Sequence, residues 1–208
     1  MVTYGQDSFW LSRNIITSLD IGTSTIQTLV AEHAKEGRRL RVIGIGTSPA
    51  AGMRRGAVVD PEDASEAIRA SVEEASRSAG VPIRSAWVAV GGTHVSVSSS
   101  KGIIAVSRAD GEISGEDVRR AIAAAETFVA RNPNREILHL IPRWFRVDEE
   151  EGVRDPVGMR GVRLEADTLV VEGSIASMKG LLKSVEAAGI RAEDYVFGPL
   201  AASSAVLT

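Results

Sequence analysis

The sequence NIITSLDIGTSTIQTLVAE, from Asn14 to Glu32, decides the fold of this chain. Two apolar arms flank a short turn that runs from Asp20 to Ser24. β-Branched residues dominate both arms, which is typical of strands rather than of a helix. The stretch therefore predicts two strands joined by a tight turn.

The turn itself has the chemistry of a phosphate site. Gly22 lets the backbone approach an anion closely, and the successive N–H groups around Thr23 and Ser24 can point at phosphate oxygens. Asp20 can hold a water molecule that is bound to Mg²⁺. Asp and Gly are also the commonest hairpin residues, so a plain structural turn is the alternative interpretation of these five positions.

Length and composition limit the possible classes of protein. The 208 residues suffice for one large or two small domains, and 44% apolar with 25% charged residues is typical of a folded protein. A net charge of -3 argues against bulk attraction to nucleic acid, and the lack of cysteine excludes disulfides. Residues 1–13 lack the apolar core of a signal peptide, so we expect a flexible leader and a cytoplasmic protein without a membrane helix.

Further along, short apolar runs and capping signals predict the rest of the first domain. Leu40–Gly46 is a third run, which predicts three antiparallel strands. Its Gly44-Ile45-Gly46 resembles a dinucleotide fingerprint, but no helix follows directly to bind a pyrophosphate. Asp60 as cap, Pro61 in the first turn and Gly80 as stop predict an amphipathic helix over 61–79.

From Ser85 the pattern indicates a smaller strand-helix-strand-strand unit. Ser114 begins a helix and Asp117 can complete its cap. The expected buried face of this helix comprises Val118, Ala121, Ile122, Ala125, Phe128 and Val129. The strand Glu136–Val147 contains Pro142, which predicts an edge or a bulge there and a surface open to a partner. Another strand over 162–172 and a helix from Ser174 to Gly189 follow.

Other conspicuous residues favour structural roles. His33, His94 and His139 lack metal-ligand spacing, so a zinc site is not expected. The aromatic pair at 144–145 between two arginines is a weak match to a nucleic-acid stacking platform in this acidic chain. The carboxylates at 165 and 167 are two residues apart on one strand, so their side chains lie on the same face. We expect this to be the solvent face of the strand rather than a metal site of a nuclease.

Several strings in fixed order carry a family resemblance. They are Asp20–Ser24, Gly91–Val95, Glu112–Val118, Arg135–Pro142, Asp155–Glu165 and Pro199–Ala201. Their order and spacing resemble the FtsA family of bacterial cell-division proteins over 14–208. The resemblance implies an α/β (α+β) fold, an actin-like and ribonuclease-H-like first lobe with an inserted subdomain. The expected bounds are 1–13 for the leader, 14–84 with 162–208 for the lobe, and 85–161 for the insertion.

The same resemblance implies a function. Members of the family bind ATP, assemble at the division septum, link the FtsZ ring to the membrane and recruit later division proteins. This chain is expected to carry the first lobe alone. The second phosphate loop, the FtsZ-binding surface and the C-terminal amphipathic membrane helix of the family would lie outside it. Self-association and contacts through 85–161 are expected at the cytoplasmic face of the plasma membrane, without nucleic acid.

The implied cofactors are ATP and Mg²⁺. By resemblance, ATP is held by Asp20, Gly22, Thr23, Ser24 and Thr25, with Asp20 positioning Mg²⁺ through water. Thr25 is a departure, since many relatives carry a basic residue there, so phosphate affinity is weaker or another group supports it. No catalytic residue is expected, and the lobe alone is not expected to hydrolyse ATP. The alternatives are a protein related to the pilus-assembly protein PilM and a free-standing protein-interaction module.

Overall fold

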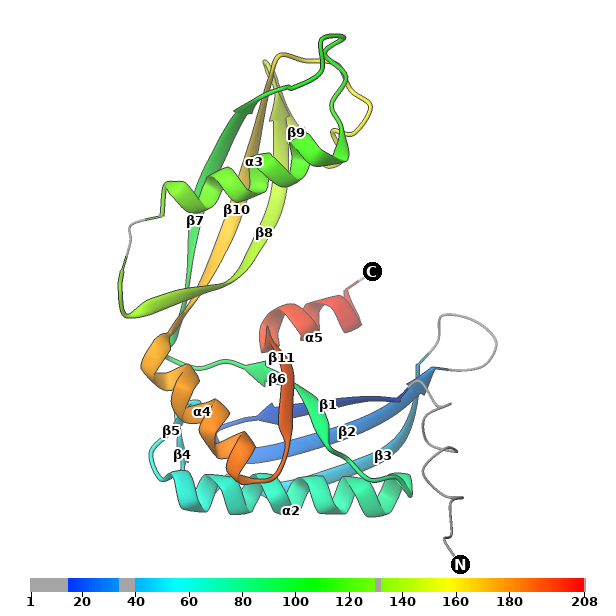
Figure 1. The fold of residues 1–208 in the computed structure, drawn as a ribbon, viewed down its shortest axis with the longest axis vertical. Coiled ribbons are helices and arrows are strands. Elements are labelled where there is room, and N and C mark those ends of the chain that lie inside the picture. The colour runs from blue at the N-terminus through cyan, green and yellow to red at the C-terminus, as the bar shows by residue number, and fades with distance from the viewer. Residues whose placement is uncertain (1–14, 34–39, 130–131, 208) are drawn as a thin grey trace, which may run out of the picture. The chain divides into compact units, whose positions relative to one another are not determined.

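The computed structural model describes residues 15–33, 40–129 and 132–207. The chain divides into two compact units, each with its own sheet (Figure 1). Unit 1 comprises the described residues within Met1–His94 and Ala176–Thr208, and unit 2 comprises those within Val95–Ile175. The predicted leader, residues 1–13, lies outside the described residues.

Unit 1 is built on a five-stranded sheet in the order β11-β6-β1-β2-β3. Its strands are β1 (Ile15–Ile21), β2 (Thr25–His33), β3 (Leu40–Pro49), β6 (Ser85–Val90) and β11 (Arg191–Phe197). The first three are antiparallel neighbours, as the sequence predicted, whereas β6 runs parallel to β1 and β11 parallel to β6. A separate hairpin pairs β4 (Met53–Arg54) with β5 (Ala57–Val58).

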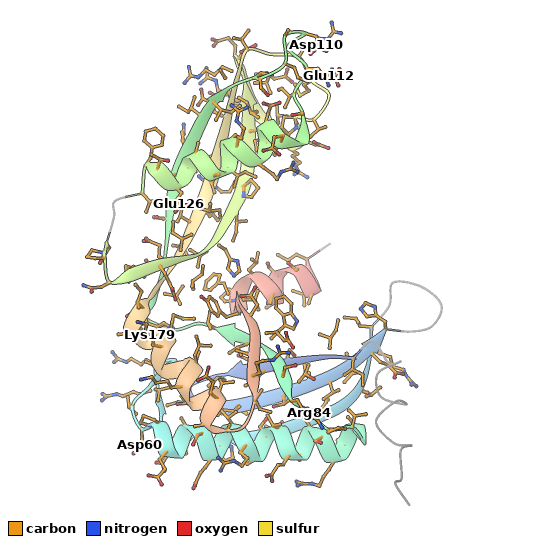
Figure 2. The ribbon with its side chains drawn as sticks, viewed as in Figure 1. Asp60, Arg84, Asp110, Glu112, Glu126 and Lys179 are labelled. Atoms are coloured by element: carbon orange, nitrogen blue, oxygen red, sulfur yellow. The ribbon has the colours of Figure 1, made fainter. Side chains whose placement is uncertain are left out.

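Three helices accompany this sheet: α2 (Pro61–Ala79), α4 (Ile175–Ala187) and α5 (Gly198–Val206). The helix α2 has the predicted bounds. The Asp60 side chain accepts hydrogen bonds from the N–H groups of Glu62 and Asp63 at its start (Figure 2), and Gly80 ends it in a left-handed conformation with φ 66°. Local capping signals therefore suffice to define this helix.

The glycines of β3 allow the helix α2 to pack closely against this strand. A Cβ atom on Gly46 would lie 1.9 Å from the Ser71 carbonyl oxygen, and one on Gly44 would lie 2.6 Å from the Cβ of Ala79, both on α2. The Ser71 hydroxyl also donates to the Gly46 carbonyl at 3.1 Å, which fixes helix against strand. The glycine pattern that resembles a dinucleotide fingerprint thus marks a helix–sheet contact.

The described residues of unit 2 form a four-stranded antiparallel sheet with one helix. The elements are β7 (Val95–Ala105), α3 (Gly115–Thr127), β8 (Arg135–Val147), β9 (Glu150–Val153) and β10 (Arg163–Ser174), and the sheet order is β7-β10-β8-β9. Its core gathers Ile113, Ala121, Phe145, Val147, Leu164 and Ala166. Phe128, which we expected on the buried helix face, is 68% exposed, because α3 has already ended and Phe128 is its C-terminal cap.

The unit boundaries differ from the expected subdomain limits of 85 and 161. The strand β6 lies in the sheet of unit 1, because it pairs with β1 and β11. At the other end, β10 pairs with β7 and β8 along its whole length, so unit 2 extends to Ile175. Both differences come from pairings between strands that are distant in sequence.

The strand β8 is irregular at Pro142. The register with β10 shifts between Asp167, which faces Trp144, and Thr168, which faces Pro142. The predicted bulge is therefore present, and Arg143 is its extra residue. On the other side, β9 pairs only with Phe145 and Val147. The first part of β8 is thus a sheet edge within the described residues.

Within residues 15–33, 40–129 and 132–207, no helix combines the length and apolar character that crossing a membrane requires.

Candidate functional site

The predicted phosphate turn connects β1 to β2 in unit 1. The Gly22 N–H donates to the Thr25 carbonyl at 3.0 Å, so the loop itself consists of Thr23 and Ser24. A Cβ atom on Gly22 would lie only 2.7 Å from the Thr25 carbonyl oxygen. Gly22 is therefore required by this close approach, not by an unusual φ angle.

The backbone N–H groups of Thr23 and Ser24 are the remaining hydrogen-bond donors of the loop. Neither Thr23 nor Ser24 has a positive φ, unlike the residues of the favoured two-residue hairpin turns. Both side chains are exposed, and their N–H groups have no partner among the described residues. The Ser24 carbonyl accepts a hydrogen bond from the Ala50 N–H at 3.1 Å, which ties the loop to the end of β3. The loop thus presents two free N–H groups, because the turn itself uses that of Gly22.

Three of the five predicted residues line one cleft. Asp20, Gly22 and Thr23 border a cleft of about 600 Å³ that lies entirely within unit 1. Ser24 and Thr25 do not line it, although both belong to the same loop. The structure therefore brings together the acid, the glycine and one hydroxyl of the motif.

Asp20 lies at the end of β1, facing Gln27 of β2. Partial burial raises the pKa of its carboxyl above the ordinary value, because desolvation disfavours the charged form. No group of three or more acidic, histidine or cysteine side chains suited to a metal occurs in the described part of the chain. A Mg²⁺ ion at Asp20 would therefore take most of its oxygen ligands from water and phosphate, which fits the usual preference of this ion.

Another part of the cleft wall comes from residues that sequence reasoning did not assign to the site. Gly56, from the β4–β5 hairpin, and Gly91 and Gly92, after β6, line it together with Trp87. The Trp87 side chain is 46% exposed, so an aromatic surface borders the cleft. The Gly91-Gly92 pair at a strand end was the available signal, since such a pair allows close approach of another backbone.

The start of α5 also borders the cleft, through Gly198, Pro199, Ala201 and Ala202. Phe197 caps this helix without a side-chain hydrogen bond. Helix N-termini leave N–H groups without intrahelical partners and carry a partial positive charge. Together with the open loop, this end makes the cleft suitable for an anionic ligand.

The other candidate residues have structural explanations. Glu165 and Asp167 are each only 8% exposed, so the expectation of a solvent face is wrong. The flanking strands and arginine side chains cover them, since Arg163 contacts Glu165 at 2.9 Å and Nε of Arg143 donates to Asp167 at 2.7 Å. The local strand pattern could not reveal these arginines as partners.

The aromatic pair of β8 is divided between core and surface. Phe145 is buried in the core of unit 2, and Trp144 is 42% exposed with the Arg143 guanidinium 4.5 Å above its ring. Arg143 and Arg146 both pair with carboxylates. The geometry therefore gives Arg143 and Trp144 a mutual contact rather than a shared nucleic-acid platform.

Comparison with known proteins finds similarity to one protein family. Residues 92–172 match the family described as the SHS2 domain inserted in FtsA. The chain is 39% identical over 198 residues to the cell division protein FtsA of Borreliella burgdorferi, which covers 95% of this chain and 48% of that protein. It is 38% identical over 197 residues to FtsA of Pseudomonas aeruginosa, covering 95% and 46%. The chain thus spans about half the length of the curated relatives that it matches.

A solved structure gives the fold. A chain of the PilM-PilN type IV pilus biogenesis complex superposes with a TM-score of 0.62 over 91% of this chain and 49% of that chain, at 14% sequence identity. At this identity the likeness shows the fold alone, and it confirms the predicted α/β class with an actin-like lobe. The matched inserted domain and the identity over nearly the whole chain show that this chain is similar to FtsA proteins over about half of their length.

Proposed function

We propose that this chain binds ATP as part of a cell-division scaffold. The observation that carries the proposal is the position of the phosphate loop. Asp20, Gly22 and Thr23 lie together on the wall of a cleft of about 600 Å³, and that cleft is formed within unit 1. This volume falls within the usual range for small-molecule sites. Similarity to FtsA over 95% of this chain supports division as the process that uses it.

Each loop residue has a distinct role in this proposal. The free N–H groups of Thr23 and Ser24 bind phosphate oxygens, and Gly22 keeps the loop tight enough to present them. Asp20 holds Mg²⁺ through water, and its partly desolvated carboxylate gains from a nearby cation. Thr25 contributes through its carbonyl, which accepts the Gly22 N–H at 3.0 Å. When bound, Mg²⁺ would neutralise phosphate charge.

We expect binding without turnover in this chain. Phosphoryl transfer requires groups that position the nucleophile and neutralise charge around the γ-phosphate. In the described part of the cleft, Asp20 is the only ionisable side chain on the wall, and it is assigned to Mg²⁺. The proposed role is therefore nucleotide-dependent assembly, with self-association as its outcome.

We assign protein contacts to unit 2 and to the parts of the scaffold beyond this chain. The partners in this proposal are FtsZ and later division proteins, and the location is the cytoplasmic face of the membrane at the septum. The first part of β8 supports a contact surface on unit 2, because it is a sheet edge that pairs with β10 but not with β9.

The phenotype of cells that lack this protein distinguishes cell division from the alternative function in pilus assembly. The PilM likeness concerns the fold alone, so it does not favour a pilus function. A fluorescent fusion of the gene at its native locus, unchanged or carrying Asp20→Asn, distinguishes the two processes. We expect septal bands from the unchanged fusion, diffuse signal from Asp20→Asn, and filamentous cells on depletion. Normal division with loss of surface pili would overturn the proposal.

A further inference from the structure

The hairpin between β4 and β5 contains an unfavourable residue in its turn. Arg55 and Gly56 form the two-residue loop, and their φ angles are 52° and 77°. Two successive positive φ angles are characteristic of a type I′ turn, whose usual sequence is Asn-Gly or Asp-Gly. A long side chain such as arginine rarely adopts this left-handed conformation. The fold alone therefore favours a different residue at position 55.

The surrounding contacts fix Arg55 beside the cleft. Its carbonyl accepts the Thr93 N–H at 3.3 Å, and the next residue, Gly56, lies on the cleft wall. A Cβ atom on Gly92 would lie 2.4 Å from the Arg55 carbonyl oxygen, so the two backbones are in close contact. Residues in sparsely populated backbone conformations persist where the surroundings hold them, and they cluster at ligand sites.

Among the residues that the structure describes, no carboxylate pairs with the charge of Arg55. Its side chain is exposed, and it forms no ion pair with the carboxylates of the described residues. Other arginines of the chain, such as Arg143 and Arg163, pair with carboxylates. The β1–β2 loop has a hydroxyl at Thr25 and no cation. A polyanion bound in this cleft would therefore need a positive charge from elsewhere.

We propose that the Arg55 guanidinium binds the polyphosphate of the nucleotide and supplies the cation that the phosphate loop lacks. This inference rests on the proposed function. Guanidinium groups form charge-assisted, often bidentate, hydrogen bonds with phosphate. The turn places the backbone of Arg55 directly before Gly56, which lines the cleft. Phosphate binding by its long side chain would account for an arginine at a position suited to asparagine.

The test uses Arg55→Asn, because asparagine suits the type I′ turn and should not disturb the fold. We expect this variant to keep or raise the melting temperature while weakening Mg-ATP binding by about 10- to 100-fold, the usual effect of losing a hydrogen bond to a charged group. Calorimetric titration with Mg-ATP and a thermal melt of the same samples give both readings. Arg55→Lys retains the charge and should restore most of the affinity.

The matched control is Arg54→Asn, which removes the same charge one residue earlier, on β4 and outside the turn. We expect this control to bind Mg-ATP within about threefold of the unchanged chain, since a charge contribution at a distance is screened. Equal loss in both variants would overturn the specific assignment, as would unchanged binding in Arg55→Asn. Failure of the unchanged chain to bind Mg-ATP would overturn the proposed function itself, and this inference with it.

Discussion

Gly56 and Gly92 are in direct backbone contact, so that a Cβ atom on either would lie 2.9 Å from the Cα of the other. Gly56 belongs to the β4–β5 hairpin, and Gly92 follows β6, the strand that pairs with β1. Both residues line the cleft that the β1–β2 loop also borders. Two segments that are distant in sequence therefore form one wall of the candidate site through glycine contacts.

This contact predicts a large effect of Gly56→Ala. The new Cβ would lie 2.4 Å from the Gly91 carbonyl oxygen, and φ is 77°, so the change adds a steric clash to backbone strain. We expect a loss of about 2–4 kcal/mol in the free energy of unfolding, measured with urea. Gly80→Ala is the matched control, because φ is 66° there but nothing lies within 4 Å. The two variants should differ clearly, and equal losses would show that the glycine contact is unimportant.

A second prediction concerns Gly102 in unit 2. A Cβ atom there would lie 1.9 Å from the Ala121 carbonyl oxygen of α3, so Gly102→Ala must displace the helix from the sheet. We expect a loss of about 1–3 kcal/mol or more in the free energy of unfolding. Gly115→Ala at the start of the same helix meets only the end of Arg119 at 3.9 Å and should change stability by less than about 1 kcal/mol. Similar values for the two would contradict the packing account.

The cap of α3 predicts a pH dependence. The buried Asp117 carboxylate accepts hydrogen bonds from the N–H and hydroxyl groups of Ser107 and Ser114, and these hydrogen bonds lower its pKa below the ordinary value. Because the pKa is lower in the folded state, the stabilisation is present above about pH 4 and is lost as the pH falls toward the folded-state pKa.

Asp117→Asn removes this titration. We expect the variant to be less stable than the unchanged chain at pH 7 and the difference to shrink as the pH is lowered below about 4. Urea unfolding followed across pH 2–8 measures it, with Glu126→Gln as control, since Glu126 is exposed on the same helix (Figure 2). A stability difference that does not change with pH would contradict the assignment.

Elements with local signals could be predicted from sequence. The helix α2 follows from Asp60, Pro61 and Gly80, and the capping box of α3 follows from Ser114 and Asp117. Each signal involves residues within a few positions of the helix end that it defines. The same holds for the turn after Asp20 and for the bulge at Pro142.

Features that depend on distant partners could not be predicted. The sequence does not show that Glu165 and Asp167 are buried, because arginines on the strand and on β8 cover them. It does not assign β6 to the first sheet, since this parallel pairing with β1 joins segments far apart in the chain. The contribution of Gly56 to the site likewise depends on a nonlocal backbone contact.

Asp20 provides a prediction in which stability and binding change in opposite directions. Burial raises the pKa of its carboxyl, so the folded state favours the protonated form. The stabilisation that is present at low pH is therefore lost as the pH rises through the folded-state pKa. Asp20→Asn mimics the protonated form. We expect this variant to melt at or above the temperature of the unchanged chain at pH 7, and a clear decrease would contradict the desolvation account.

The most direct test of the central claim is calorimetric titration of this chain with ATP in the presence and absence of Mg²⁺. The account predicts saturable binding that is strengthened by Mg²⁺, with the Mg²⁺-dependent gain lost in Asp20→Asn and no release of phosphate. Binding that is absent, or that is equally strong and equally Mg²⁺-dependent in Asp20→Asn, would contradict the assignment of the β1–β2 loop as a nucleotide site.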